Sequence, residues 1–371
     1  MNIPRHFTYF LFENFDPAQE SNNTWNPRNF MNASADEILT WVAEASKQYR
    51  TYRIACERFS KDAINKLING GTLRVENDVL FFDTPIFFDE DTDSIASFFS
   101  NAASAFTRMI FQREKELYIE AEALKNGFSP QINLYHIICG MCFDGYFLDK
   151  LSETGALANE RMHPSGLDYL SVIYEKSAKL DHFSNALLCS YNRVFNDVCA
   201  LQSFGDGDGN RLDCYRYFRM REKNALTDSF AEIHKVTANL TEYDLLSAMR
   251  NILLGSAVAP ELIISLETFG YLKSGRVCVP VFEKKHSNTI QRIESILEDV
   301  LLQPISEWLS DLNSLKIIAM AHGVPQKEIA NECWHILFGS INEMLVQSGF
   351  VTAPLYHKGE GRYLQSVEIY V

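Results

Sequence analysis

Basic residues gather in one short stretch of an otherwise acidic chain. Between positions 47 and 74 there are seven basic and two acidic residues, a local charge of +5, with three aromatic residues among them. Lysine, arginine and asparagine side chains bind phosphate oxygens and the edges of bases. The sequence therefore predicts a DNA-contacting face formed by Lys47, Arg50, Arg53, Arg58, Lys61, Asn65, Lys66 and Arg74. A solvated helix face that pairs with acids elsewhere in the chain is the alternative.

Two other patterns contain residue types that bind metal ions. His136, Cys139 and Cys142 are three residues apart, but a structural zinc site needs a fourth ligand, and no second Cys-x-x-Cys pair occurs. The segment 206–210 is similar to the opening of a calcium loop, yet the glycine and the bidentate acid that such a loop needs further on are missing. We therefore expect buried helical cysteines, a flexible linker, and no metal or cofactor.

Catalytic motifs are missing from the sequence. It contains no phosphate-binding loop, no nucleophile elbow, no zinc-protease helix and no dinucleotide fingerprint, so we expect a protein that is not an enzyme. The acidic run at 89–93 precedes a predicted helix, and we expect it to stabilise that helix through the helix dipole.

The composition restricts the class of protein. The 371 residues include 34 basic and 48 acidic ones, a net charge of −14, which excludes a surface that binds nucleic acid everywhere but leaves room for a single basic face. The chain starts without a secretory signal, and no apolar run approaches the ~18 residues of a membrane span. Without a signal, the eight cysteines are expected to be reduced. We therefore expect a cytoplasmic protein that does not associate with membranes.

The chain also repeats itself. At an offset of 194 residues the matched pairs are Cys139 and Cys333, Gly145 and Gly339, Gly155 and Gly349, His163 and His357, Tyr169 and Tyr363, and Leu170 and Leu364. At a similar offset, Gly71, Leu73, Pro85 and Phe87 match Gly270, Leu272, Pro280 and Phe282. These matches predict a tandem duplication. The first copy spans 1–176, the second spans 211–371, and 177–210 is predicted to be a connecting helix followed by a flexible Gly/Asp linker.

Each copy is predicted to contain two units of one design. In each unit, helices lead to a glycine and then to two short strands joined by a polar turn. These units span about 34–90, 130–175, 240–285 and 325–371, and the first hairpin pairs 72–75 with 79–82. This order of elements resembles the winged-helix form of the helix-turn-helix, in which the second helix enters the major groove and the hairpin contacts the backbone. No particular family within that superfamily is identified.

The predicted fold is therefore α+β and mainly helical, with tandem winged-helix units joined by long helices in two related halves. The resemblance implies a DNA-associated protein, a transcription regulator, in which the duplicated halves act as an internal pseudo-dimer. The helix equivalent to the basic one, at 259–272, carries Glu261 and Glu267 and no basic residue, so only the first unit is expected to bind double-stranded DNA. The alternative is a non-catalytic protein-binding scaffold, such as an accessory subunit of a chromosome-organising complex, which binds a protein partner or a second copy of itself.

Overall fold

The computed structural model describes residues 5–13, 31–158, 161–162, 168–184, 190–205, 211–357 and 361–370. About 58% of the chain is helical and 16% is in strands, which confirms a mainly helical α+β protein. The chain divides into two units. Unit 1 comprises Met1–Ala102, Leu151–Ser184 and Ile305–Ile336, and unit 2 comprises Ala103–Lys150, Asn185–Pro304 and Leu337–Val371.

These units do not coincide with the two predicted copies, because each contains residues from both halves of the chain. The division falls within four helices: α5 (Thr92–Gln112), α8 (Phe147–Glu153), α14 (Ser287–Ser310) and α16 (Gln326–Gln347). The long helices predicted at 93–124 and 288–312 therefore each contribute to both units.

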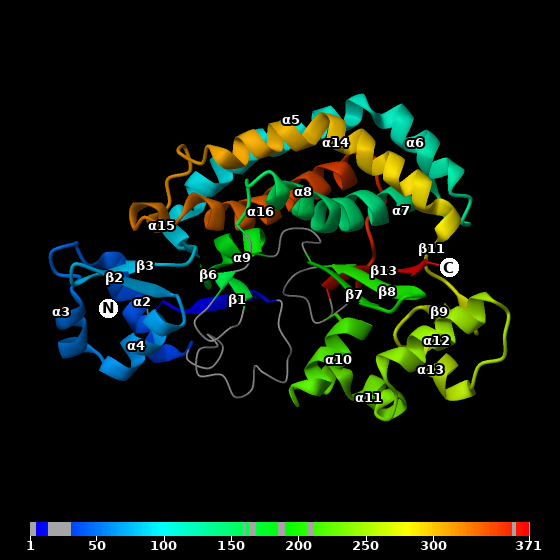
Figure 1. Ribbon diagram of the computed structural model, residues 1–371, viewed down its shortest axis with the longest axis horizontal. Helices are drawn as coiled ribbons and strands as arrows, with labels where there is room; N and C mark the ends of the chain where they lie inside the picture. Colours follow the sequence, from blue (N-terminus) through cyan, green and yellow to red (C-terminus); the bar gives the residue numbers. More distant parts are fainter. Residues whose placement is uncertain are drawn as a thin grey trace. The chain divides into compact units, whose positions relative to one another are not determined.

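Three helices and a hairpin form the first part of unit 1, drawn in blue in Figure 1. They are α2 (Ala33–Glu44), α3 (Tyr52–Arg58), α4 (Lys61–Asn69), β2 (Leu73–Glu76) and β3 (Val79–Phe82). The side chains of Asn32 and Thr51 accept hydrogen bonds from the first free N–H groups of α2 and α3, which fixes where those helices begin. Asn77 and Asp78 adopt positive φ angles of 51° and 66°, as a two-residue hairpin turn requires.

The sheet of unit 1 is built around β6 (Asp168–Glu175). β1 (Phe7–Glu13) and β5 (Arg161–Met162) pair with it antiparallel, and β4 (Ile86–Phe87) pairs with it parallel. The 3₁₀ turn η2 (Asp89–Asp91) leads from β4 into α5, and the short helices α9 (Ala178–Ser184) and α15 (Ile318–Ala321) complete the unit. Its core includes Ile38 and Leu39 of α2, Ile64 of α4 and Ile173 of β6, which are fully buried.

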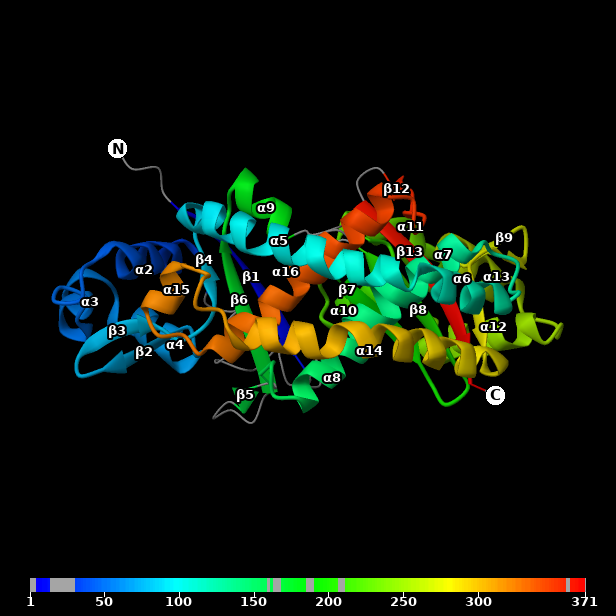
Figure 2. The same cartoon turned by 90° about the horizontal axis from the view of Figure 1, so that it is seen from above.

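Unit 2 contains most of the remaining helices. They are α6 (Glu114–Ala123), α7 (Pro130–Leu134), the π-helix η3 (Tyr135–Tyr146), α10 (Cys214–Glu222), the 3₁₀ turn η4 (Asp228–Phe230), α11 (Ala231–Thr237), α12 (Glu242–Leu253) and α13 (Pro260–Thr268). A short hairpin of β9 (Leu272–Lys273) and β10 (Arg276–Val277) follows α13, next to it in both Figure 1 and Figure 2. The hairpin turn again uses positive φ angles, at Ser274 and Gly275.

The sheet of unit 2 repeats the strand order of the first. β13 (Gly361–Ile369) pairs antiparallel with β8 (Cys199–Gly205) and β12 (Tyr356–His357), and parallel with β11 (Val281–Glu283). The 3₁₀ turn η5 (Lys284–His286) leads from β11 into α14, as η2 leads from β4 into α5. β7 (Ser190–Phe195) is an additional strand, paired with β8. Apart from β7, the two sheets therefore share one topology.

The connecting helix predicted within 177–210 is wrong at 190–205. Residues 190–205 form the hairpin of β7 and β8 instead. Asn196 begins the turn between these strands, and its side chain accepts hydrogen bonds from the backbone of Val198 and Cys199. β8 is buried along its whole length, so its apolar residues match a buried strand as well as a helix.

The second predicted unit in each copy also differs from the expectation. In the unit predicted at 325–371, α16 is one continuous helix, so no pair of helices precedes β12 and β13. In the unit predicted at 130–175, β6 is the central strand of a sheet rather than half of a free hairpin. Among the residues that the structure describes, helix, turn, helix and hairpin follow one another in the units at 34–90 and 240–285. Among the described residues, no helix has both the length and the apolar character that crossing a bilayer requires.

Candidate nucleic-acid interface

The structure distributes the eight predicted DNA-contacting residues over α3, α4, β2 and the segment before α3. This segment is joined to the hairpin, because Thr51 forms a β-bridge with Val79 and the amide of Leu80 donates to the carbonyl of Arg50 (2.8 Å). The eight residues therefore belong to one part of unit 1. Their side chains, however, fall into a buried or engaged group and an exposed group.

Arg50 lies inside unit 1, with 7% of its surface exposed. Its Nη1 donates to Nε2 of His322 (2.5 Å) and to the carbonyl of Val42 (3.4 Å). Burial lowers the pKa of this guanidinium. Because the side chain is enclosed, Arg50 cannot be the phosphate contact that the sequence predicts.

Arg74 is half-buried and fully engaged within unit 1. Its Nη1 donates to the carbonyl of Phe82, its Nη2 to the carbonyl of His322 (2.8 Å), and its Nε to Oε1 of Glu76 (2.7 Å). Since these bonds occupy all three nitrogens, Arg74 links β2 to β3 and to the segment after α15. It is not available to bind a phosphate without giving up those contacts.

Three of the predicted cations lie close to the ring of Phe81. Lys47 Nζ, Arg50 Cζ and Arg74 Cζ lie 5.7, 5.0 and 5.2 Å from the centre of the Phe81 ring. His322 stacks on the neighbouring ring of Phe82, with ring centres 4.4 Å apart. Burial and the two arginines lower the pKa of His322 to about 3, so the imidazole is neutral and can accept the hydrogen bond from Arg50. No spacing in the sequence linked His322 to this cluster.

The remaining predicted residues are on the surface. Arg53 and Arg58 of α3 are exposed, as are Lys61 and Lys66 of α4. Asn65, between them on α4, is half-buried, and its Oδ1 accepts a hydrogen bond from the hydroxyl of Tyr52 (2.9 Å). With Lys47, five of the seven basic residues are therefore exposed to solvent.

Acidic residues reduce the charge of this face. Glu57 and Asp62 are exposed on α3 and α4, and Oδ2 of Asp62 lies 2.8 Å from Nζ of Lys66. Glu76 and Asp78 are exposed at the end of the hairpin. Five exposed cations and four exposed acids thus share this surface. The positive charge lies on the two helices, and the hairpin end is negative.

The corresponding face of α13 in unit 2 has a different chemistry. Ile264 is 48% exposed, and Glu261 one turn before it is exposed. At the end of α12, Leu253 and its C-cap residue Leu254 are 36% and 64% exposed. The chain from 251 to 272 contains two acids and no basic residue. This face is therefore apolar and acidic where the face of α4 is polar and partly basic.

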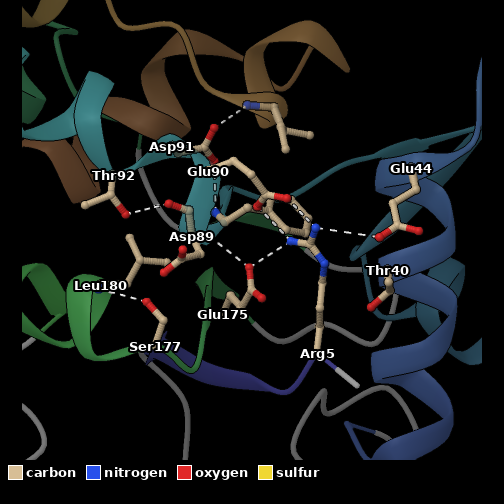
Figure 3. Close-up of polar contacts among 12 residues, drawn as sticks. Arg5, Thr40, Glu44, Asp89, Glu90, Asp91, Thr92, Glu175, Ser177 and Leu180 are labelled. Atoms are coloured by element: carbon tan, nitrogen blue, oxygen red, sulfur yellow. Dashed lines mark hydrogen bonds and ion pairs between the residues drawn. The ribbon is translucent and has the colours of Figure 1, made fainter. Parts of the chain in front are cut away.

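The acidic run at 89–93 forms a structural ion-pair network with Arg5, shown in Figure 3. Nη1 of Arg5 donates to Glu90 (2.8 Å) and to Glu175 (2.9 Å), and these contacts lower the pKa of Glu90 while raising that of Arg5. Glu44 of α2 lies 3.6 Å from the same guanidinium. Arg5, just before β1, therefore links Glu90 of this run to α2 and β6 within unit 1, which the sequence alone did not indicate.

Asp91 has a separate role in that run. Its Oδ2 accepts from the amide of Phe88 (2.9 Å), and its Oδ1 accepts from the amide of Ile318 (3.0 Å). Burial outweighs these bonds and raises the pKa of Asp91 to about 6. The carboxylate thus caps the start of η2, and it also fixes the start of α15.

The histidine and cysteines with metal-ligand spacing are buried in η3, as expected. Burial lowers the pKa of His136 to about 3 and raises those of Cys139 and Cys142. In the part of the chain that the structure describes, no three His, Cys, Asp or Glu residues are arranged to hold a metal ion. The calcium-loop-like segment 206–210 and His163 lie outside the described residues.

A group of half-buried acids in unit 2 was not found by sequence reasoning. Burial, followed by the like charges of Glu368 and Glu298, raises the pKa of Glu294 to about 7. The hydroxyl of Tyr146 donates to Glu298, and Nε2 of Gln202 donates to Glu368 (2.9 Å). Glu294 can therefore gain or lose a proton near neutral pH, and its charge, after burial, contributes to the raised pKa of the Cys142 thiol.

These placements leave α3 and α4 as the surface that best fits the sequence prediction. Comparison of the chain with protein-family models, with curated proteins and with solved structures found no match.

Proposed function

We propose that this chain is a DNA-associated protein of winged-helix type, a transcription regulator, that contacts the duplex through α3 and α4 of unit 1. The observation that carries the proposal is the solvent face of α4. Lys61, Lys66 and Asn69 are exposed there, Asn65 lies between them, and no apolar side chain is exposed on that helix. Lysines suit phosphates and asparagines suit base edges, so this face has the composition of a helix in a major groove.

The arrangement around α4 supports the same proposal. A helix, a bridge strand at Thr51, two helices and a hairpin follow one another, and this is the order of elements in the winged helix. The buried Arg50 and the engaged Arg74 become structural residues, and the phosphate contacts are reduced to Arg53, Arg58, Lys61 and Lys66. The acidic hairpin end stands away from the phosphates in this proposal.

Fluorescence anisotropy with a random-sequence duplex tests the proposal. Four phosphate contacts give a slope of about −3.6 for log K against log salt, so affinity should fall roughly 150-fold between 50 and 200 mM salt. The double variant Lys61→Glu with Lys66→Glu should abolish binding. The matched control, Arg276→Glu with Lys284→Glu in unit 2, should leave DNA binding intact. Absence of binding at low salt, or equal loss in the control, would refute it.

The second candidate is a protein-binding scaffold, and the exposed face of α13 favours it. Ile264 is an exposed apolar side chain one turn after the exposed Glu261, and Leu253 and Leu254 at the end of α12 are exposed as well. A partner would need apolar and basic residues to match this face. A photo-crosslinking amino acid at position 264, compared with one at position 119 on α6, measures whether one protein is captured at α13 alone in the native cell.

A further inference from the structure

A surface hollow of about 280 Å³ lies in unit 2, between α12 and the turn that joins β7 to β8. Tyr243, Ser247, Arg250 and Asn251 line it from α12, and Asn196 lines it from the turn. The α12 residues are spaced three, four and seven apart, so they share one face of the helix. Leu246 and Val198 add apolar surface to the same hollow.

The wall formed by the turn is held in place before any ligand arrives. Oδ1 of Asn196 accepts from the amides of Val198 (2.9 Å) and Cys199 (3.0 Å), so the side-chain NH₂ is the group left to meet a ligand. Sγ of Cys199 donates to the carbonyl of Leu246 (3.4 Å), which ties β8 to α12. The two walls are therefore connected through hydrogen bonds within unit 2.

The polar groups of the hollow are mainly hydrogen-bond donors. Arg250 is exposed, and in the described part of the chain no carboxylate pairs with it. Burial raises the pKa of the Cys199 thiol to about 11, and the positive charge of Arg250 lowers that pKa, so the charge acts on the interior of the unit. Asn196, Ser247 and Asn251 contribute further N–H and O–H groups. Asp197 belongs to the same turn but does not line the hollow.

We propose that this hollow binds a small anion that carries a ring or another apolar group. The carboxylate or phosphate lies on Arg250 and the amides of Asn196 and Asn251, and the apolar part lies against Tyr243 and Leu246. Tyr243 is 69% exposed, so its ring is open to a stacked ligand. The volume is at the lower end of small-molecule sites, which limits the ligand to about the size of one amino acid.

Calorimetric titration with two anions tests the site and identifies the headgroup. Phenyl phosphate and phenylacetate are the probes, and phenol is the neutral analogue of the same size. At least one anion should bind with a dissociation constant below about 1 mM, and phenol should bind much more weakly. Binding of only one anion supports the proposal and shows which headgroup the site prefers.

Substitutions separate this site from general attraction to the protein. Arg250→Gln should weaken binding at least about tenfold, because a charge-assisted hydrogen bond is lost. Arg276→Gln, an exposed arginine of β10 outside the hollow, should leave the affinity unchanged. Tyr243→Ala should weaken phenyl phosphate binding but not inorganic phosphate binding. No binding of either anion, or equal affinity in Arg250→Gln, overturns the proposal, and it does so without bearing on DNA binding.

Discussion

Replacing Arg74 by alanine should destabilise unit 1 and leave DNA binding unchanged. The substitution removes the bonds from Nη1 to the carbonyl of Phe82 and from Nη2 to the carbonyl of His322, together with the contact to the Phe81 ring. Hydrogen bonds from charged donors contribute about 1.5–3 kcal/mol each, and an exposed cation–π contact adds ~0.5–1 kcal/mol. Together these contributions come to about 3.5–7 kcal/mol. Because the side chain is 23% exposed, solvent screening reduces this sum by roughly half, and we expect a loss of about 2–4 kcal/mol.

Urea unfolding and hydrogen exchange measure this effect at two levels. A loss of this size moves the unfolding midpoint of unit 1 by about 1 M urea. The amides of 318–324 should exchange faster, because Arg74 binds the carbonyls of His322 and Gly323. Arg53→Ala, an exposed arginine on α3, is the matched control and should change stability by less than ~0.5 kcal/mol. Unchanged stability in Arg74→Ala together with weaker DNA binding would show that the arginine is a DNA contact and that the structural assignment is wrong.

Three further predictions follow from the contacts described above. Asp62→Asn should strengthen DNA binding at low salt, because it removes an acid from α4 and frees Lys66 from their 2.8 Å ion pair; anisotropy titration would show weaker or equal binding if this reasoning is wrong. Glu294→Gln should stabilise the protein relative to wild type at pH 8 but not at pH 4. Because the folded pKa is near 7, above the unfolded value, the stability of the wild type falls as the pH rises from about 4.5 to 7. Urea unfolding at each pH measures this loss, which we expect to be ~1–2 kcal/mol after allowance for partial exposure. Gly205→Ala should reduce the melting temperature strongly, because a Cβ there would lie 2.5 Å from the Cβ of Tyr363 and 2.7 Å from the carbonyl of Arg362; an unchanged melting temperature would contradict that packing.

Local signals in the sequence predicted local structure well. Thr241 and Asp244 have the sequence spacing of a capping box, and in the structure they form one at the start of α12. The turn at Asn77 and Asp78 and the hairpin around it were also predicted, because turn residues encode their own backbone angles. At the start of α2, Ser34 and Glu37 have the spacing of a capping box, but Asn32, two residues earlier, is the residue whose side chain accepts the bonds.

Properties that depend on distant residues were not predictable in this way. The burial of Arg50 depends on His322, which is 272 positions away, and the engagement of Arg74 depends on the same segment. A count of charges along the chain treats both arginines as surface residues. For the same reason, apolar residues at 190–205 were assigned to a helix, because only the pairing of β8 with β13 shows that they form a buried strand.

Unit 1 is built from segments that lie far apart in the sequence, and this determines when it can fold during synthesis. Its first stretch ends at Ala102, but the unit also contains Ile305–Ile336, which includes α15 and the His322 that bonds to Arg50. At about 5–20 residues per second, a ribosome needs roughly 12–47 s to travel from residue 102 to residue 336. During that interval Arg50 and Arg74 lack their hydrogen bonds to His322, and the Phe82 ring has no His322 to stack on. Unit 1 therefore completes its folding late in translation, and the nascent chain is the form in which a chaperone would meet this surface.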